Sequence, residues 1–124
     1  ILRAFLERFG KEQGVEISVR GVTDPAQGVL ELSMSGEYYD LIALDVRMPK
    51  LGGDEIYDWL AREKPHLLDA VVFITAYRND LKARFPNHRL RILEKPFRYE
   101  RFASFLRRSL AGAPTDTGEH LAPA

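Results

Sequence analysis

Residues 40–49 read Asp-Leu-Ile-Ala-Leu-Asp-Val-Arg-Met-Pro, an apolar run that ends at an aspartate and breaks at a proline shortly afterwards. The apolar residues 41–44 have the length of a strand and show no alternation of apolar and polar side chains. Strands of this kind are buried on both faces of a parallel sheet. Residues 48–53 are rich in turn formers, so we expect a loop there, with Asp45 where the strand meets it.

Further apolar runs of strand length follow later in the chain, and segments with helical periodicity lie between them. Residues 71–74 and 90–93 are further apolar strands, and alternation of Val15, Ile17 and Val19 predicts another over residues 15–19. We predict five helices: one that ends near residue 10, one from residue 24 to about 36, one that ends before Pro65, one over about 79–85, and one that includes residues 102–110. One helix followed by four strand–helix units predicts an α/β fold with a doubly wound parallel sheet.

Length and composition are those of one globular domain. The chain has 124 residues, of which 45% are hydrophobic and 29% are charged. It has no cysteine, which excludes a disulfide framework and a thiolate metal site. No apolar run approaches the roughly 20 residues of a membrane span, so we expect a cytoplasmic domain with no membrane partner. We expect the domain to cover residues 1–110, followed by a disordered tail over residues 111–124.

Three polar side chains of complementary chemistry follow the three fully apolar strands. Asp45 closes the first run, Thr75 closes the second, and Lys95 follows the third by one residue. Ligands bind at the carboxyl ends of parallel strands, so we expect the three side chains to form one site. An aspartate can attack a phosphoryl group, whose charge is then neutralised by Mg²⁺, a lysine and a hydroxyl donor. Asp45 and the backbone carbonyl of Arg47 are the predicted Mg²⁺ ligands from this chain.

The segments 40–49, Phe73-Ile74-Thr75-Ala76 and Leu93-Glu94-Lys95-Pro96-Phe97 resemble the receiver domain of two-component response regulators. The resemblance covers residues 1 to about 110. It implies a flavodoxin-like fold of strand order 2-1-3-4-5, in which the four predicted strands would be strands 2 to 5. It also implies that a histidine kinase or phosphotransfer protein phosphorylates Asp45 with Mg²⁺. Two further implications are a cis bond between Lys95 and Pro96 and a close backbone approach at Gly53.

The chain departs from the family pattern in three places. The acidic pair at the end of the family's strand 1, which carries much of its Mg²⁺ binding, is absent, because Ile1 already lies in the predicted first helix. We therefore expect strand 1 in a longer native chain, or a strand supplied by a neighbour. Ile92 replaces a residue that is often aromatic, so we expect signalling to pass through the helix at about 79–85 and the loop around Tyr77 and Arg78. The short segment 79–85 is typical of receivers attached to hybrid sensor kinases.

The formal net charge of zero conceals a basic segment. Residues 78–108 contain ten basic and three acidic residues, which gives +7 there and −7 in the rest of the chain. Such a segment is typical of a nucleic-acid surface, or of helical faces whose arginine stems cover apolar surface. It has no recognition motif and no aromatic residues interleaved on one stripe. It also covers the last strand and the helices on either side, the usual contact surface of receivers, so we expect it to dock an output protein and not nucleic acid.

Two other functions would use the same residues. A haloacid-dehalogenase-like phosphatase also has a nucleophilic aspartate at a strand end, but it requires a second acidic residue two positions later. Arg47 stands at that position, so we predict that the chain is not an enzyme. A degenerate receiver that docks partners without being phosphorylated stays open, because the acidic pair lies outside this sequence.

Overall fold

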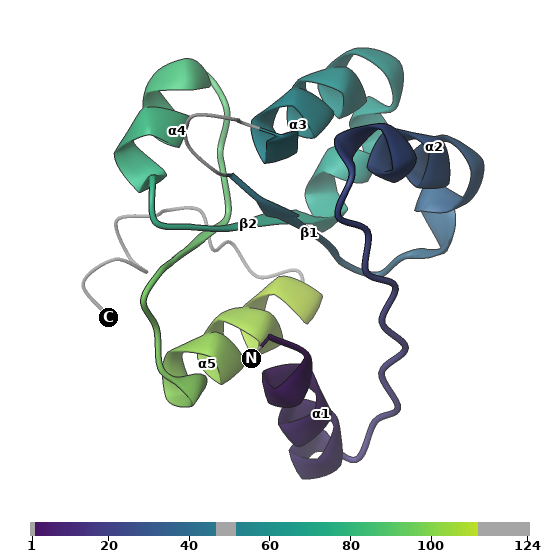
Figure 1. Ribbon diagram of the computed structural model, residues 1–124. Helices are drawn as coiled ribbons and strands as arrows, with labels where there is room; N and C mark the ends of the chain where they lie inside the picture. The colour runs from purple at the N-terminus through teal and green to yellow at the C-terminus, as the bar shows by residue number, and fades with distance from the viewer. Residues whose placement is uncertain (1, 47–51, 112–124) are drawn as a thin grey trace.

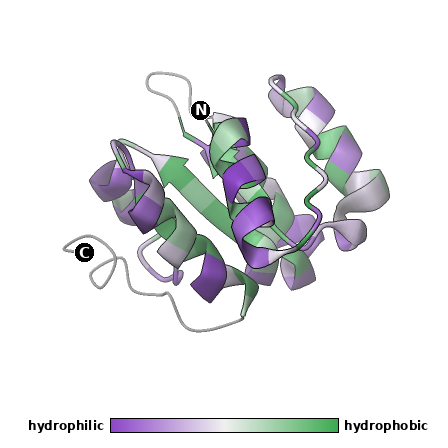
Figure 2. Ribbon diagram, turned by 90° about the horizontal axis from the view of Figure 1, so that it is seen from below, coloured by the Kyte–Doolittle hydropathy of each residue, from purple (hydrophilic) through white to green (hydrophobic). Residues whose placement is uncertain are grey.

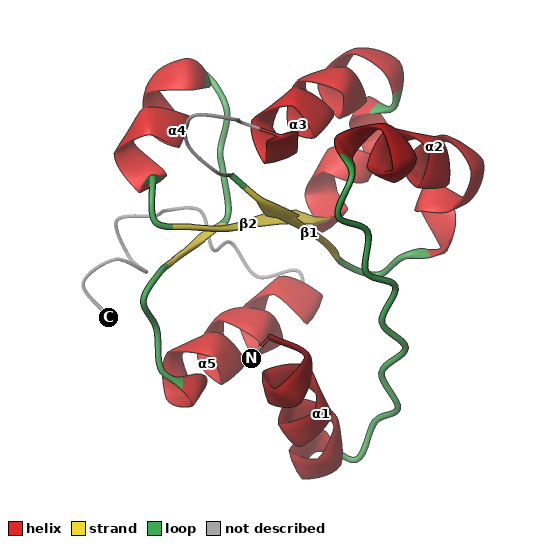
Figure 3. Cartoon of the chain, viewed as in Figure 1, coloured by secondary structure: helices red, strands yellow, loops and turns green. Residues whose placement is uncertain are grey.

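The computed structural model describes residues 2–46 and 52–111, and helices alternate with short strands along the chain (Figures 1 and 3). The elements in chain order are the helices α1 (Leu2–Gln13) and α2 (Pro25–Ser35), the 3₁₀ helix η1 (Gly36–Tyr38), strand β1 (Ile42–Asp45), helix α3 (Gly52–Glu63), the 3₁₀ helix η2 (Pro65–Ala70), strand β2 (Val71–Thr75), helix α4 (Arg78–Arg84), strand β3 (Ile92–Glu94) and helix α5 (Tyr99–Leu110).

The three strands form one parallel sheet of order β1-β2-β3, which confirms the predicted α/β class. Ile42 pairs with Val71 and Phe73 pairs with Ile92, so the three carboxyl ends lie at one edge. These strands correspond to strands 3, 4 and 5 of the order that the receiver resemblance implies. The outer edge of β1 has no strand partner among the described residues.

Helices lie on both faces of the sheet, which explains why the strand sequences show no polar alternation, although Ala43 of β1 stays exposed. Figure 1 shows α2, α3 and α4 on one face and α1 and α5 on the other. In β2, Val71 and Phe73 pack toward the first group of helices, whereas Val72 and Ile74 pack toward the second. All five β2 residues are buried. Figure 2 shows the hydrophobic strands enclosed between helices whose outer faces are hydrophilic.

Helix α2 begins where its capping sequence predicts, whereas α1 does not end at the first glycine of the sequence. Asp24 accepts a hydrogen bond from the Ala26 amide at 3.3 Å, and Pro25 is the first helical residue. The prediction that α1 ends near Gly10 is wrong. Gly10 is buried within the helix, and α1 continues to Gln13, followed by Gly14 with a φ of 68°. The helix therefore stops where a left-handed conformation is adopted, not at the first glycine in the sequence.

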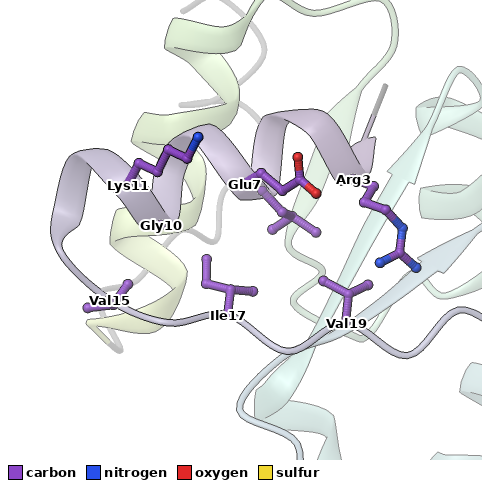
Figure 4. A pocket seen from close by; sticks show the side chains of 8 residues that line it. Arg3, Glu7, Gly10, Lys11, Val15, Ile17 and Val19 are labelled. Atoms are coloured by element: carbon purple, nitrogen blue, oxygen red, sulfur yellow. The ribbon is translucent and has the colours of Figure 1, made fainter.

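The strand predicted over residues 15–19 is also wrong, since this segment is not a strand in the structure. The side chains of Val15, Ile17 and Val19 point toward α1 across a groove of about 500 Å³ (Figure 4). The alternation in the sequence thus correctly indicates which side chains share one side. A strand also needs a neighbour with which to exchange backbone hydrogen bonds, and no described strand pairs with this segment.

No helix in the described part of the chain is long and apolar enough to cross a membrane. Helix α5 ends at Leu110. Residues 112–124 lie outside the described residues, so the domain boundary and the disordered tail stay predictions.

Candidate functional site

The candidate site lies at the carboxyl edge of the sheet. Asp45 is the last residue of β1, Thr75 is the last residue of β2, and Lys95 comes directly after β3. The Lys95 amide donates a hydrogen bond to the Thr75 carbonyl at 2.9 Å, which joins the ends of β2 and β3. The peptide bond between Lys95 and Pro96 is cis, as the receiver resemblance implies.

Asp45 and Lys95 face one another. The Lys95 Nζ lies 3.4 Å from Asp45 Oδ2 and 3.5 Å from Oδ1. The exposed fractions of the two side chains are 35% for Asp45 and 44% for Lys95, so solvent reaches both. An ion pair this exposed contributes about 1 kcal/mol or less to folding stability. The pair therefore places an accessible carboxylate beside a cation without stabilising the fold much.

Thr75 bonds through its hydroxyl to backbone atoms and not to the Asp45 carboxylate. Its side chain is fully buried, and its Oγ1 donates to the carbonyl of Val46 at 3.3 Å. The same oxygen accepts a hydrogen bond from the Tyr77 amide at 2.9 Å. The hydroxyl thus connects the residue after Asp45 with the residue that precedes α4.

Gly53 brings the first turn of α3 into contact with the backbone of Asp45. A Cβ atom at Gly53 would lie 2.5 Å from the carbonyl oxygen of Asp45 and 2.9 Å from its carbonyl carbon. Real Cβ atoms do not approach backbone atoms this closely, so one of the two elements would have to move. The close approach predicted for Gly53 from the receiver resemblance is therefore present.

We expect Gly53→Ala to lower the free energy of unfolding by about 1–3 kcal/mol, because backbone atoms cannot yield as a side chain can. Urea denaturation of the full-length protein measures this change. Gly28→Ala is the matched control, because its Cβ would meet the Cδ1 methyl of Ile56 at 3.2 Å, and the tip of a side chain can shift. Equal effects of the two substitutions would contradict the close packing at Gly53.

Two charged residues beside the site were not singled out from the sequence. Arg84 Nη1, on α4, donates to Asp54 Oδ2, in the first turn of α3. Asp54 is 1% exposed, and burial raises the pKa of its carboxyl although the Arg84 charge opposes the rise. Asp54 lies one turn before Tyr57, on the buried face of α3, which the helical register could have indicated. Its partner, thirty residues away, has no such signal.

The predicted Mg²⁺ ligands are described only in part. Asp45 supplies a carboxylate at the site, whereas Arg47 lies outside the described residues. The described residues contain no group of three or more carboxylate, histidine or cysteine side chains that could hold a metal ion. Mg²⁺ commonly binds through one or two carboxylates, with water and phosphate oxygens completing its shell. The Asp45 carboxylate has the right chemistry for one ligand.

The groove of Figure 4 is separate from this site. Its lining residues come from α1 and the segment after it, and none of the three predicted site residues is among them. A smaller hollow of about 140 Å³ borders β1 and α2, and it does not include the predicted site residues either.

Comparison with known proteins gives a consistent result. The family model of the response regulator receiver domain matches residues 1–107. An uncharacterized response regulatory protein of Yersinia pestis is 29% identical over 102 residues, which cover 82% of this chain and 40% of that protein. One of Shewanella oneidensis is 30% identical over 96 residues, covering 77% and 39%. The chain thus spans about two fifths of the length of these curated relatives.

Proposed function

This chain belongs to the family of response regulator receiver domains, and on that premise we propose that it is phosphorylated on Asp45 and relays a signal by docking a partner protein. The observation that carries the proposal is the Asp45 carboxylate, about one third exposed, with Lys95 Nζ at 3.4 Å. In this proposal the chain is a signalling module of the cytoplasm and not an enzyme. Whether it is one part of a hybrid sensor kinase stays a prediction from the sequence.

The proposed reaction is the transfer of a phosphoryl group from a phosphohistidine of a kinase or phosphotransfer protein. An oxygen of Asp45 attacks phosphorus, an O–P bond forms, and the P–N bond of the donor breaks. The electron pair of that bond returns to the imidazole nitrogen, which takes up a proton from water. Lys95 attracts the phosphoryl oxygens as a compact point charge. Thr75 would donate to another phosphoryl oxygen once its hydroxyl leaves the carbonyl of Val46.

The proposal includes a magnesium ion. The Asp45 carboxylate would hold it, together with the backbone carbonyl of Arg47, which is the second ligand predicted from the sequence. When bound, the ion would neutralise negative charge on the phosphoryl oxygens.

The test is phosphate uptake by the full-length protein from a small donor such as acetyl phosphate, measured by intact mass. With Mg²⁺ we expect one added phosphate, which hydroxylamine releases because it is an acyl phosphate. Chelation of Mg²⁺ by EDTA should abolish the uptake. If no phosphate is taken up with Mg²⁺ present, the domain is a degenerate receiver that docks without phosphorylation.

We further propose that the α4, β3 and α5 surface, which contains the basic segment 78–108, docks a protein. Three of its cations already have partners in the chain, because Arg84 binds Asp54, Arg91 donates to the Asp69 carbonyl, and Lys95 pairs with Asp45. These side chains are less available for the several phosphate contacts that DNA binding requires.

We expect no binding of random duplex DNA to the full-length protein at micromolar concentration and at about 0.15 M salt. Fluorescence anisotropy across a salt series measures this. Micromolar or tighter binding that weakens steeply with salt, and that is lost on Lys82→Glu together with Arg107→Glu, would contradict protein docking as the role of this surface.

A further inference from the structure

The ion pair between Asp54 and Arg84 connects the helices α3 and α4. Asp54 lies in the first turn of α3 and Arg84 is the last residue of α4. The Asp54 side chain is almost fully buried, with an exposed fraction of 2%, whereas the Arg84 side chain is 38% exposed. Arginine thus reaches inward from the surface to a carboxylate that solvent does not reach.

This ion pair leaves α4 connected to the candidate site at both of its ends. At the start of α4, the Tyr77 amide donates to Thr75 Oγ1, and that hydroxyl donates to the carbonyl of Val46. At the other end, Arg84 binds Asp54, and the neighbouring Gly53 lies against the backbone of Asp45. One end of α4 is therefore linked to β2 and the other end to the turn that contacts β1.

Arg84 is the main group that compensates the negative charge of Asp54. Asp54 Oδ1 is buried and has no hydrogen-bond partner among the described residues. Burial raises the pKa of this carboxyl, and the Arg84 charge is the strongest of the opposing effects. A buried carboxylate whose one cation is removed keeps its desolvation cost without compensation. Loss of Arg84 should therefore force the first turn of α3 and the end of α4 apart, or force Asp54 to take up a proton.

We propose that Asp54 and Arg84 are positioning residues that hold α4 against the first turn of α3, so that a change at Asp45 and Thr75 is transmitted to α4. The proposal rests on the function proposed above, in which phosphorylation of Asp45 draws the Thr75 hydroxyl away from Val46. The Arg84 end then stays fixed while the Tyr77 end moves. Without the ion pair, the amides of α4 exchange rapidly even before phosphorylation, so phosphorylation changes their exchange little.

The test is hydrogen exchange of the amides of residues 78–85 in the full-length protein, with and without acetyl phosphate and Mg²⁺. We expect Arg84→Gln and Asp54→Asn each to raise this exchange at least tenfold without the donor. Each should reduce the donor-dependent change to less than a third of the parental change, while Asp45 still takes up phosphate. The double variant should exceed neither single variant, because both remove the same contact.

Lys82→Gln is the matched control, because it removes a positive charge from the same helix at a residue two positions away. We expect it to leave the exchange of α4 at the parental level. Asp54→Asn also separates positioning from general stability, since a neutral side chain relieves a buried charge. The midpoint of urea unfolding should therefore fall little or rise, while exchange in α4 increases.

The proposal is overturned if the α4 amides of both single variants exchange at the rate of the parent protein. It is also overturned if exchange rises as much in α5 as in α4. If Arg84→Gln does not fold, Asp54→Asn and Arg84→Lys decide in the same way, with Arg84→Lys expected to exchange more slowly than Asp54→Asn. If the parent protein takes up no phosphate, the proposed function fails by itself. The exchange measured without donor then still shows whether the ion pair holds α4.

Discussion

Full-length protein carrying Asp45→Asn is expected to take up no measurable phosphate from acetyl phosphate, at least a hundredfold less than the parent. An amide oxygen is a poor nucleophile compared with a carboxylate, so the O–P bond does not form. The substitution is nearly isosteric, and it removes an exposed ion pair with Lys95 that is worth about 1 kcal/mol or less. Loss of uptake would therefore reflect lost chemistry and not lost folding, which circular dichroism can check.

Asp58→Asn provides the control for this experiment. Asp58 is an exposed carboxylate of α3 that lies 3.7 Å from Arg62, so it also belongs to a surface ion pair. We expect it to leave phosphate uptake unchanged. Uptake by the Asp45→Asn protein at the parental rate would mean that another residue is phosphorylated, and the assignment of Asp45 would be wrong.

The second large effect is expected for Lys95→Arg, which should accept phosphate but respond to it weakly. Lys95 Nζ already lies 3.4 Å from Asp45, and its backbone amide is bonded to the Thr75 carbonyl. Its ammonium is a compact charge on a flexible stem, whereas a guanidinium is a planar fork that cannot take the same place. We expect the donor-dependent change in hydrogen exchange over residues 77–85 to fall to less than half of the parental change.

We expect Lys95 to share the free energy of switching with Thr75. Moving a two-state equilibrium from 1:99 to 99:1 takes about 5.5 kcal/mol, which is far more than the roughly 1 kcal/mol of an ion pair as exposed as that of Lys95 and Asp45. Thr75 must therefore contribute as well, through the hydrogen bond that connects it to Tyr77. Lys11→Arg, at an exposed lysine of α1, is the control and should switch as the parent does. Full switching by Lys95→Arg would leave Lys95 as a strand-end residue without a role in signalling.

Much of the fold could be read from local sequence patterns. The unbroken apolar runs at 41–44 and 71–74 predicted parallel strands buried on both faces, and β1 and β2 lie there. All residues of β2 are buried, whereas Ala43 in β1 is exposed. The run at 90–93 became β3 at Ile92–Glu94, shifted by one to two residues. The segment at 15–19 failed because a strand is a property of a pair of neighbouring backbones, whereas alternation is a property of one chain.

By itself, the sequence determined that Asp45, Thr75 and Lys95 share one sheet edge, because each stands at the end of its own apolar run and parallel strands end together. The tertiary structure alone decided which contacts these residues make. It directs the Thr75 hydroxyl to the carbonyl of Val46, and it brings Arg84 to Asp54 across thirty residues of chain. Local patterns of a few residues set where a strand ends. The partner of a buried charge is set by how the helices pack against one another, so no local pattern shows that Arg84 contacts Asp54.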